Sequence, residues 1–297
     1  MSDLCPVCGS TNAVERFPAQ IETLNDAAFS YAFGAEHRKT LRVVRCRDCT
    51  HQFCSPIPSD LSNRYASSEI DRDYLAHSES RILSARAMFD ALPRFASGAK
   101  LLDVGCATGD FLVVARERGL DATGVELSAW SAAIARERGF VVHEQPLAEV
   151  HGESLFDVIA MVGVIEHFTD PAEQLRHVHR LLTPNGIFAG WTGDVASITS
   201  RLLGRRWWYW QGQHLQYFTR RSLAELLRRT SFATPAITSY PFVATRTSIA
   251  HSLTRYRGHG VMSMLLRPLF ALKPAWTLRI PGEMLFIAQR LEPTTTA

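Results

Sequence analysis

Four of the six cysteines in this chain form two closely spaced pairs, Cys5 with Cys8 and Cys46 with Cys49. In each pair two residues separate the cysteines, so a short turn can point both sulfurs at one ion. Four thiolates make a tetrahedral zinc site with no open position for water, which is a structural site. Gly9 follows the first pair and suits the tight turn there. The alternative, a redox disulfide, is disfavoured by two similar pairs in a reducing compartment.

A second group of residues lies where a strand turns into a helix. The segment 100–104 reads as a strand and 110–118 as a helix, with Gly105 and Gly109 in the turn between them. Glycines there let a ligand approach the backbone, and the helix N-terminus offers free N–H donors. Glu126 ends the next strand, where a carboxylate can accept hydrogen bonds from both hydroxyls of a ribose. Together these features predict a nucleoside cofactor.

The spacing in this turn distinguishes between cofactors. It reads D-x-G-x-A-x-G from Asp103 to Gly109, not the G-x-G-x-x-G of dinucleotide sites. It resembles the first motif of the class I S-adenosylmethionine-dependent methyltransferases, and the similarity extends over about 100–192. A dehydrogenase and an incidental glycine turn are the alternatives. The resemblance implies that the amino-acid moiety, the ribose and the adenine of the cofactor are held by Asp103, Gly105, Ala107, Gly109, Glu126, Leu127, Gln145 and Val162.

Two histidines are candidate catalytic residues. Glu166 and His167 follow the fourth expected strand in a stretch that resembles the Glu-His…Asp-Pro segment of methyltransferases acting on small molecules, sugars and quinone precursors. His214 follows the aromatic run 207–210. That second segment resembles one in zinc-bearing methyltransferases of bacterial polysaccharide and glycolipid biosynthesis. Either imidazole could act as general base on an acceptor hydroxyl. The alternatives are a lid residue that bonds the backbone at His167, and a hydrophobic plug at the aromatic run.

Alternating strands and helices position these residues. The pattern predicts an α/β fold with a doubly wound, mostly parallel, seven-stranded sheet and a small N-terminal zinc-ribbon module. We expect the zinc module at 1–58, a linking helical segment at 59–98 with a helix over about 69–92, and the cofactor-binding domain at 99–297. A basic amphipathic insertion is expected at about 243–281. We also expect strands at 156–162, 236–242 and 283–290, and helices that begin at Ser128, Asp170-Pro171 and Thr219.

Composition narrows the class of protein. The 297 residues are 46% hydrophobic and 21% charged, which excludes disorder, collagen and coiled coil. No apolar run is long enough to span a bilayer, and the N-terminus has no signal-peptide pattern, so a cytoplasmic protein is expected. Residues 201–297 carry 14 basic against three acidic residues, a balance of +11; since the whole chain is +3, residues 1–200 carry −8. The basic third suggests a negative partner, although a solvated arginine-rich surface is the alternative.

The insertion at 245–281 mixes arginines with Trp276 and aliphatic residues. Such a segment can lie in a membrane interface, so a peripheral membrane contact is one expectation; core packing or a dimer contact explains it equally well.

The leading interpretation is an S-adenosylmethionine-dependent methyltransferase with a structural zinc, acting on a small-molecule or lipid-linked anionic acceptor, a sugar above all. A zinc-containing RNA methyltransferase is the second interpretation, because arginines and aromatic side chains also suit exposed bases. An inactive methyltransferase-like scaffold is the third.

Overall fold

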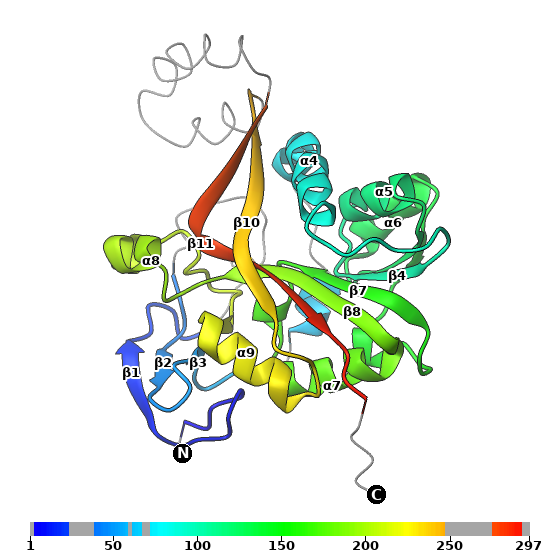
Figure 1. The fold of residues 1–297 in the computed structure, drawn as a ribbon. Helices are drawn as coiled ribbons and strands as arrows, with labels where there is room; N and C mark the ends of the chain where they lie inside the picture. The colour runs from blue at the N-terminus through cyan, green and yellow to red at the C-terminus, as the bar shows by residue number, and fades with distance from the viewer. Residues whose placement is uncertain (1–2, 24–38, 59–60, 67–71, 247–274, 293–297) are drawn as a thin grey trace, which may run out of the picture.

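The computed structural model describes residues 3–23, 39–58, 61–66, 72–246 and 275–292. Its described strands form a seven-stranded sheet in the order β10-β11-β8-β7-β4-β5-β6 and a four-stranded sheet in the order β1-β2-β3-β9. Figure 1 shows the large sheet at the centre and the small sheet beside it, at the end near the N-terminus. The predicted α/β class and the seven strands are confirmed.

The large sheet is parallel except for one strand. Strands β6, β5, β4, β7 and β8 run parallel in that spatial order, whereas β11 is antiparallel to both of its neighbours, β8 and β10. The strands are β4 (Lys100–Val104), β5 (Asp121–Val125), β6 (Val141–His143), β7 (Phe156–Val162), β8 (Leu182–Gly193), β10 (Ala236–Thr245) and β11 (Ala275–Gln289).

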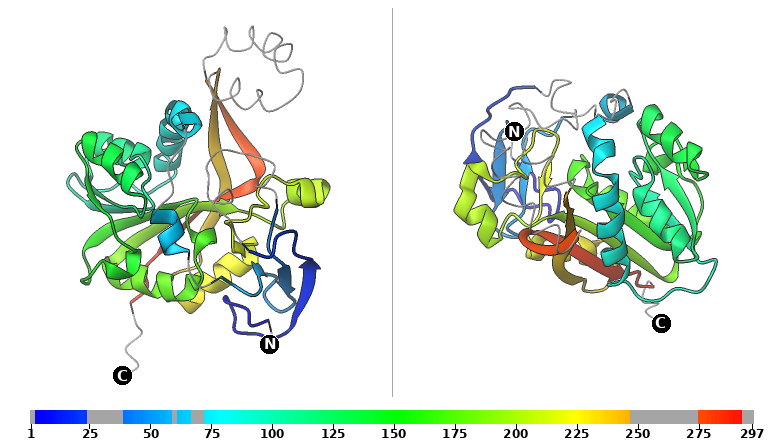
Figure 2. Two further views of the ribbon diagram at one scale, coloured as in Figure 1. Left: turned by 180° about the vertical axis from the view of Figure 1, so that it is seen from behind. Right: turned by 90° about the horizontal axis from the view of Figure 1, so that it is seen from above.

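Helices cover both faces of this sheet (Figure 2). Helices α4 (Ser78–Phe89), α5 (Asp110–Glu117) and α6 (Ala129–Glu137) lie on one face, and α7 (Pro171–Leu181) and α9 (Arg220–Arg229) on the other. Neighbouring residues of one strand belong to opposite layers: Leu101 packs under α4 and α5, while Leu102 belongs to the layer of α7 and α9. Both faces are therefore buried, which is why these strands read as continuous apolar runs.

Polar side chains cap the N-termini of three of these helices. Ser128 accepts a hydrogen bond from the backbone of α6, Asp170 does so for α7 with Pro171 at the first position, and Thr219 forms a capping box on α9. These contacts satisfy backbone N–H groups that a helix start leaves free. These capping hydrogen bonds explain why the helices begin at the expected residues.

The last two strands are longer than expected. We expected the final strand over 283–290, but β11 begins at Ala275, and Ala275 to Arg279 pair with Pro241 to Thr245. The two strands form an arm that extends beyond the sheet next to α4 (Figure 1). Val243 donates its N–H to Ser84 Oγ at 2.8 Å, which ties α4 to this arm. Most of the expected amphipathic insertion, 247–274, lies outside the described residues. No helix that the structure describes is both long and apolar enough to cross a membrane.

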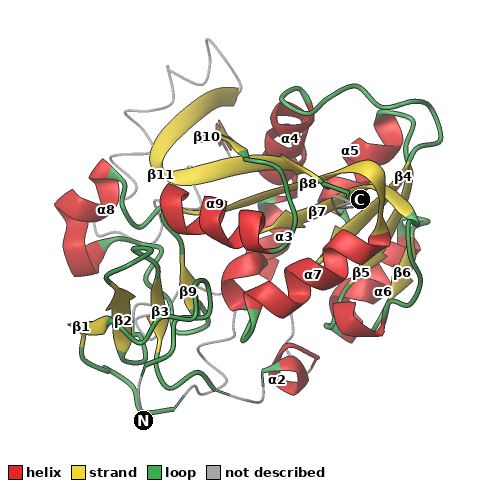
Figure 3. Ribbon diagram, turned by 60° about the horizontal axis from the view of Figure 1, so that its bottom comes forward, coloured by secondary structure: helices red, strands yellow, loops and turns green. Residues whose placement is uncertain are grey.

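The linking segment is not one continuous helix. It contains α2 (Ser62–Ala66), α3 (Arg72–Ala76) and α4, and part of the expected helix over 69–92 lies outside the described residues. The small sheet contains β1 (Ala13–Phe17), β2 (Val43–Cys46), β3 (Gln52–Cys54) and β9 (Gln216–Tyr217). Figure 3 shows β9 at the edge of this sheet, beside β3. A strand from far along the chain therefore completes the cysteine-bearing sheet. The remaining helices are α8 (Ile198–Leu203) and the short 3-10 turns η2 (Leu147–Glu149), η3 (Ile165–His167) and η4 (Gly204–Arg206).

Candidate active site and zinc centre

The glycine-containing turn lies at the carboxyl end of β4 and leads into α5. Gly105, Ala107 and Gly109 all have left-handed backbone conformations, with φ of 70°, 46° and 85°. A Cβ on Gly105 would stand 2.6 Å from Val164 Cγ2, so the turn lies directly against the segment that follows β7. Ala107 is the residue of these three that is not glycine. The left-handed backbone conformation costs alanine free energy that glycine does not lose.

Glu126 fastens this turn to the end of β5. One carboxylate oxygen accepts the Ala107 N–H and the other accepts the Ser128 N–H, both at 2.8 Å. Burial raises the pKa of Glu126, and the backbone donors act in the opposite direction. Each carboxylate oxygen has a second lone pair, so both can still accept a hydrogen bond from a ligand hydroxyl. The side chain thus both shapes the turn and retains the capacity to bind a ribose diol.

The other predicted cofactor residues lie on the same edge of the sheet. Asp103 is on β4, Leu127 follows β5, Gln145 follows β6, and Val162 is the last residue of β7. These four strands are adjacent, in the order β7-β4-β5-β6, so their carboxyl ends meet along one edge. Asp103 is 2% exposed, and burial together with the nearby Glu126 and Asp110 carboxylates raises its pKa well above the usual value. The arrangement is the one that the predicted cofactor site requires.

Two residues near this edge were missed by the sequence interpretation. The Arg81 guanidinium stacks on the Tyr74 ring at 3.6 Å and forms an ion pair with Asp110 at 2.7 Å. Burial raises the pKa of Tyr74 to about 12, with the Glu126 and Asp103 charges adding to the effect. Asp110 also binds Arg138 of α6 at 2.7 Å. This network connects α3 and α4 to the helices behind the glycine turn, and no local pattern in the sequence indicates it.

The structure brings Glu166, His167 and His214 together. One ligand atom from each lies within 4.8 Å of the others. We call these three residues the Glu-His-His cluster. Glu166 and His167 follow β7, whereas His214 comes from the segment before β9, and the His167 and His214 rings lie 4.9 Å apart in an edge-to-face arrangement. Both candidate catalytic histidines are therefore in one place, and the segment that bears His167 approaches the glycine turn through Val164.

Neighbouring groups fix the two imidazoles. His214 Nδ1 lies 2.8 Å from the Tyr209 carbonyl oxygen, and His167 Nδ1 lies 3.0 Å from the Gln213 carbonyl oxygen. Since a carbonyl only accepts, His214 Nδ1 carries the proton and His214 Nε2 keeps its lone pair. Tyr65 of α2 also contacts His167 Nδ1 at 2.7 Å, which the sequence did not suggest. Burial lowers the pKa of His214 well below its usual value, with the His167 charge adding to the effect.

The small sheet holds His214 in this position. The Cys54 N–H of β3 donates to the Leu215 carbonyl and the Leu215 N–H donates to the Glu166 carbonyl, both at 2.9 Å. Gln216 bridges the same elements through its side chain, accepting from His51 Nε2 and donating to the Phe168 carbonyl, again at 2.9 Å. The cysteine-bearing module is therefore continuous, through hydrogen bonds, with the Glu-His-His cluster.

Most of the aromatic run 207–210 is buried and does not line an open site. Trp207, Tyr209 and Trp210 are at most 3% exposed and pack against the small sheet, as the hydrophobic-plug alternative would have it. Trp208 is half-buried, and its indole N–H donates to Glu283 at 3.2 Å. The Trp191 indole donates to the other Glu283 oxygen, also at 3.2 Å. Glu283, a half-buried acid that the sequence analysis did not single out, thus lies behind the cluster.

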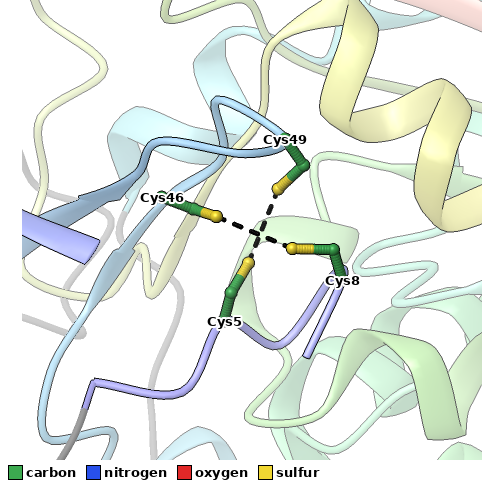
Figure 4. A group of neighbouring side chains, drawn as sticks. All are labelled: Cys5, Cys8, Cys46 and Cys49. Carbon is green, nitrogen blue, oxygen red and sulfur yellow. Dashed lines mark hydrogen bonds between the residues drawn. The ribbon is translucent and has the colours of Figure 1, made fainter. Parts of the chain in front are cut away.

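The four predicted zinc ligands converge (Figure 4). Cys5 Sγ lies 3.6 Å from Cys49 Sγ, and Cys8 Sγ lies 3.6 Å from Cys46 Sγ. A tetrahedron with Zn–S bonds of about 2.3 Å has S···S edges of about 3.8 Å, so the observed spacing fits zinc. Disulfides would need about 2.05 Å.

Both cysteine turns have the same backbone geometry. Gly9 N–H donates to the Cys5 carbonyl at 2.9 Å, and Thr50 N–H donates to the Cys46 carbonyl at 3.1 Å. Gly9 and Thr50 have φ of 75° and 70°. Glycine adopts this conformation readily, whereas Thr50 is held in it by neighbours: its hydroxyl contacts that of Thr219, the cap of α9, at 2.8 Å. The second turn therefore depends on the large domain.

The fold and the site define a doubly wound cofactor-binding domain of the methyltransferase type. A family model described as "Methyltransferase domain" matches residues 75–234, more than half of the chain, and the protein belongs to this family. The Ubiquinone biosynthesis O-methyltransferase of Pseudomonas aeruginosa is 36% identical over 98 residues, which cover 30% of this chain and 42% of that protein. The chain thus matches less than half the length of that curated relative.

Solved structures share the fold at low sequence identity. Phosphoethanolamine N-methyltransferase 2 of Haemonchus contortus, in complex with S-adenosyl-L-methionine, superposes with a TM-score of 0.53 at 16% identity. That alignment covers 81% of this chain and 62% of the other. The cyclase SpnF superposes with a TM-score of 0.52 at 19% identity over 80% of this chain and 100% of its own. Because a protein described as a cyclase has this fold too, the reaction must be argued from the site.

Proposed function

We propose that this protein transfers a methyl group from S-adenosylmethionine to an oxygen atom of a small-molecule acceptor, with a sugar hydroxyl as the favoured acceptor. The Glu-His-His cluster carries the proposal, because it places proton acceptors after the carboxyl end of β7, in the segment whose Val164 approaches Gly105 of the glycine turn. The family membership and the O-methyltransferase relative support the same chemistry. A lipid-linked or anionic form of the acceptor remains part of the proposal.

In this proposal the chain's residues hold the cofactor at the edge of the sheet. Glu126 accepts hydrogen bonds from the ribose diol, Asp103 and the Gly105–Gly109 turn surround the amino-acid moiety, and Leu127, Gln145 and Val162 border the adenine side. When bound, S-adenosylmethionine supplies an electrophilic methyl group on a sulfonium. Methyl transfer then needs mainly proximity and in-line geometry. The cluster would orient the acceptor hydroxyl toward that methyl group and receive its proton at an imidazole Nε2.

The chemistry of the cluster and its surroundings supports the proposed acceptor class. Imidazoles and a carboxylate suit a hydroxyl, whose proton must leave during transfer. Trp191 and Trp208 are half-buried and donate their indole N–H groups to Glu283, and aromatic faces commonly pack against sugar rings. The arginines of α9 have partners within the protein: Arg220 pairs with Asp194, Arg228 and Arg229 pair with Glu225, and Arg221 binds the Asp48 carbonyl. The proposal therefore does not depend on a phosphate on the acceptor.

Calorimetry and a product assay test the proposal in sequence. Titration of the full chain with S-adenosylmethionine should show one binding site. Absence of binding would contradict our proposal and favour the inactive-scaffold interpretation. Formation of S-adenosylhomocysteine should then appear with a panel of nucleotide-linked and free sugars. His214→Asn should lower kcat by about 10²–10⁴-fold without a comparable change in cofactor affinity. Turnover with RNA and not with sugars would favour the RNA interpretation and contradict ours.

A further inference from the structure

The Glu-His-His cluster contains a buried carboxylate beside two imidazoles. Glu166 is 1% exposed, and its carboxylate accepts a hydrogen bond from the Thr192 hydroxyl at 3.1 Å. Half-buried Glu283 lies behind the cluster and accepts the indole N–H groups of Trp191 and Trp208. Among the described residues Glu166 forms no ion pair with lysine, arginine or histidine. A cation bound in the cluster would therefore meet a carboxylate that no described basic side chain neutralises.

The histidine side chains in the cluster are prepared as metal ligands. His214 donates its Nδ1–H to the Tyr209 carbonyl, which leaves its Nε2 lone pair available, and His167 Nδ1 contacts both the Gln213 carbonyl and the Tyr65 hydroxyl. Metal-binding histidines in proteins commonly have this second hydrogen bond, which fixes the tautomer and the ring orientation.

We propose that Glu166, His167 and His214 bind one divalent first-row transition-metal cation. Two imidazoles and one carboxylate are a known donor set for Zn²⁺, Fe²⁺ and Mn²⁺, and three protein ligands leave coordination positions open. This distinguishes the cluster from the four-cysteine site, which is closed. The ligand atoms of the three residues all lie within 4.8 Å of one another, and two opposite ligands of a metal with bonds near 2.1 Å lie about 4.2 Å apart.

The inference deepens the proposed function and rests on it for its chemical meaning. An acceptor hydroxyl on an open position would lose its proton more readily, because a bound cation lowers the pKa of a coordinated oxygen. The proton passes to water or buffer, and the resulting alkoxide oxygen forms the new bond to the methyl carbon as the bond from that carbon to sulfur breaks. The cation keeps its oxidation state throughout the methyl transfer. When the metal ion is bound, His167 and His214 act as its ligands and not as general bases.

Mn²⁺ titration of the full chain loaded with only one equivalent of zinc, which the four thiolates bind in preference, followed by electron paramagnetic resonance, tests the site. Mn²⁺ prefers oxygen and imidazole donors to thiolates, so it reports on the cluster and leaves the cysteine site occupied by zinc. We expect one equivalent of bound Mn²⁺. Glu166→Gln and His214→Ala should each weaken it at least tenfold, and Glu173→Gln, an exposed acid in the first turn of α7, should not.

A parallel calorimetric titration with S-adenosylmethionine separates the two proposals. Variants that keep cofactor affinity but lose Mn²⁺ are folded, and their behaviour supports the metal site. Wild-type protein that binds S-adenosylmethionine but takes up no Mn²⁺, or Glu166→Gln that binds Mn²⁺ as tightly as wild type, overturns the metal site and leaves the methyltransferase proposal standing. Mn²⁺ binding without any cofactor binding supports the metal site and contradicts the proposed function.

Discussion

Glu126→Gln is the substitution that examines the cofactor site most directly. The side chain accepts two backbone N–H groups at 2.8 Å, one from Ala107 and one from Ser128. Glutamine has nearly the same shape, but its NH₂ group can only donate. One of the two backbone N–H groups therefore faces a donor and loses its partner, and the negative charge that would bind the ribose diol disappears.

The expected loss follows from these contacts. A hydrogen bond to a charged group contributes about 1.5–3 kcal/mol and a neutral one about 0.5–1.5 kcal/mol. If one ligand hydroxyl loses its acceptor and the other meets a neutral oxygen, the loss is about 2–3 kcal/mol. At about 1.4 kcal/mol for each factor of ten, Kd for S-adenosylmethionine should rise about 30- to 150-fold. The unpaired backbone N–H should also lower the free energy of unfolding by about 1–3 kcal/mol.

Isothermal titration calorimetry and urea unfolding measure both effects. Glu137→Gln is the matched control, because this residue is an exposed glutamate on α6 in the same part of the fold. Zinc content should be equal in wild type, variant and control. A Kd within threefold of wild type for Glu126→Gln would show that this carboxylate does not hold the ribose, and the assignment of the site would be wrong.

Three further predictions concern the buried acid, the zinc centre and the aromatic interior. Because burial raises the pKa of Asp103, the free energy of unfolding should fall as pH rises from the ordinary carboxyl pKa to this raised pKa. Binding of cationic S-adenosylmethionine should lower the pKa of Asp103, so proton release, seen as a buffer-dependent binding enthalpy, should be larger in wild type than in Asp103→Asn. Cys46→Ser should lose zinc by metal analysis and lower the thermal midpoint, since metal binding stabilises the fold; an unchanged midpoint would refute this role. Gly193→Ala should cost about 1–3 kcal/mol in urea unfolding, because overpacking in a tight interior carries that penalty. Its Cβ would stand 2.5 Å from the Tyr209 ring, whose residue holds His214, so kcat should fall as well; stability equal to wild type would contradict the packing.

Local patterns in the sequence determine most of the large sheet. Lys100–Val104 and Phe156–Val162 form strands at the expected residues, because doubly covered strands must be almost wholly apolar. Ser128, Asp170-Pro171 and Thr219 set helix starts, since a capping side chain acts within three residues of itself. The two cysteine pairs converge as their spacing predicts. Each of these signals acts over a few residues or depends on one residue type, so it can be read without the fold.

Tertiary structure alone decides the contacts between distant segments. Gln216 pairs with β3 across more than 160 residues, and this pairing brings His214 to Glu166 and His167. Tyr65, Tyr74 and Glu283 reach the site from segments whose sequences carry no motif. The arm of β10 and β11 extends past the expected strand ends because pairing between two strands, not the preference of either, sets their length. Hydrophobic periodicity and capping residues specify elements, whereas the assembly of the Glu-His-His cluster depends on the packing of two sheets against each other.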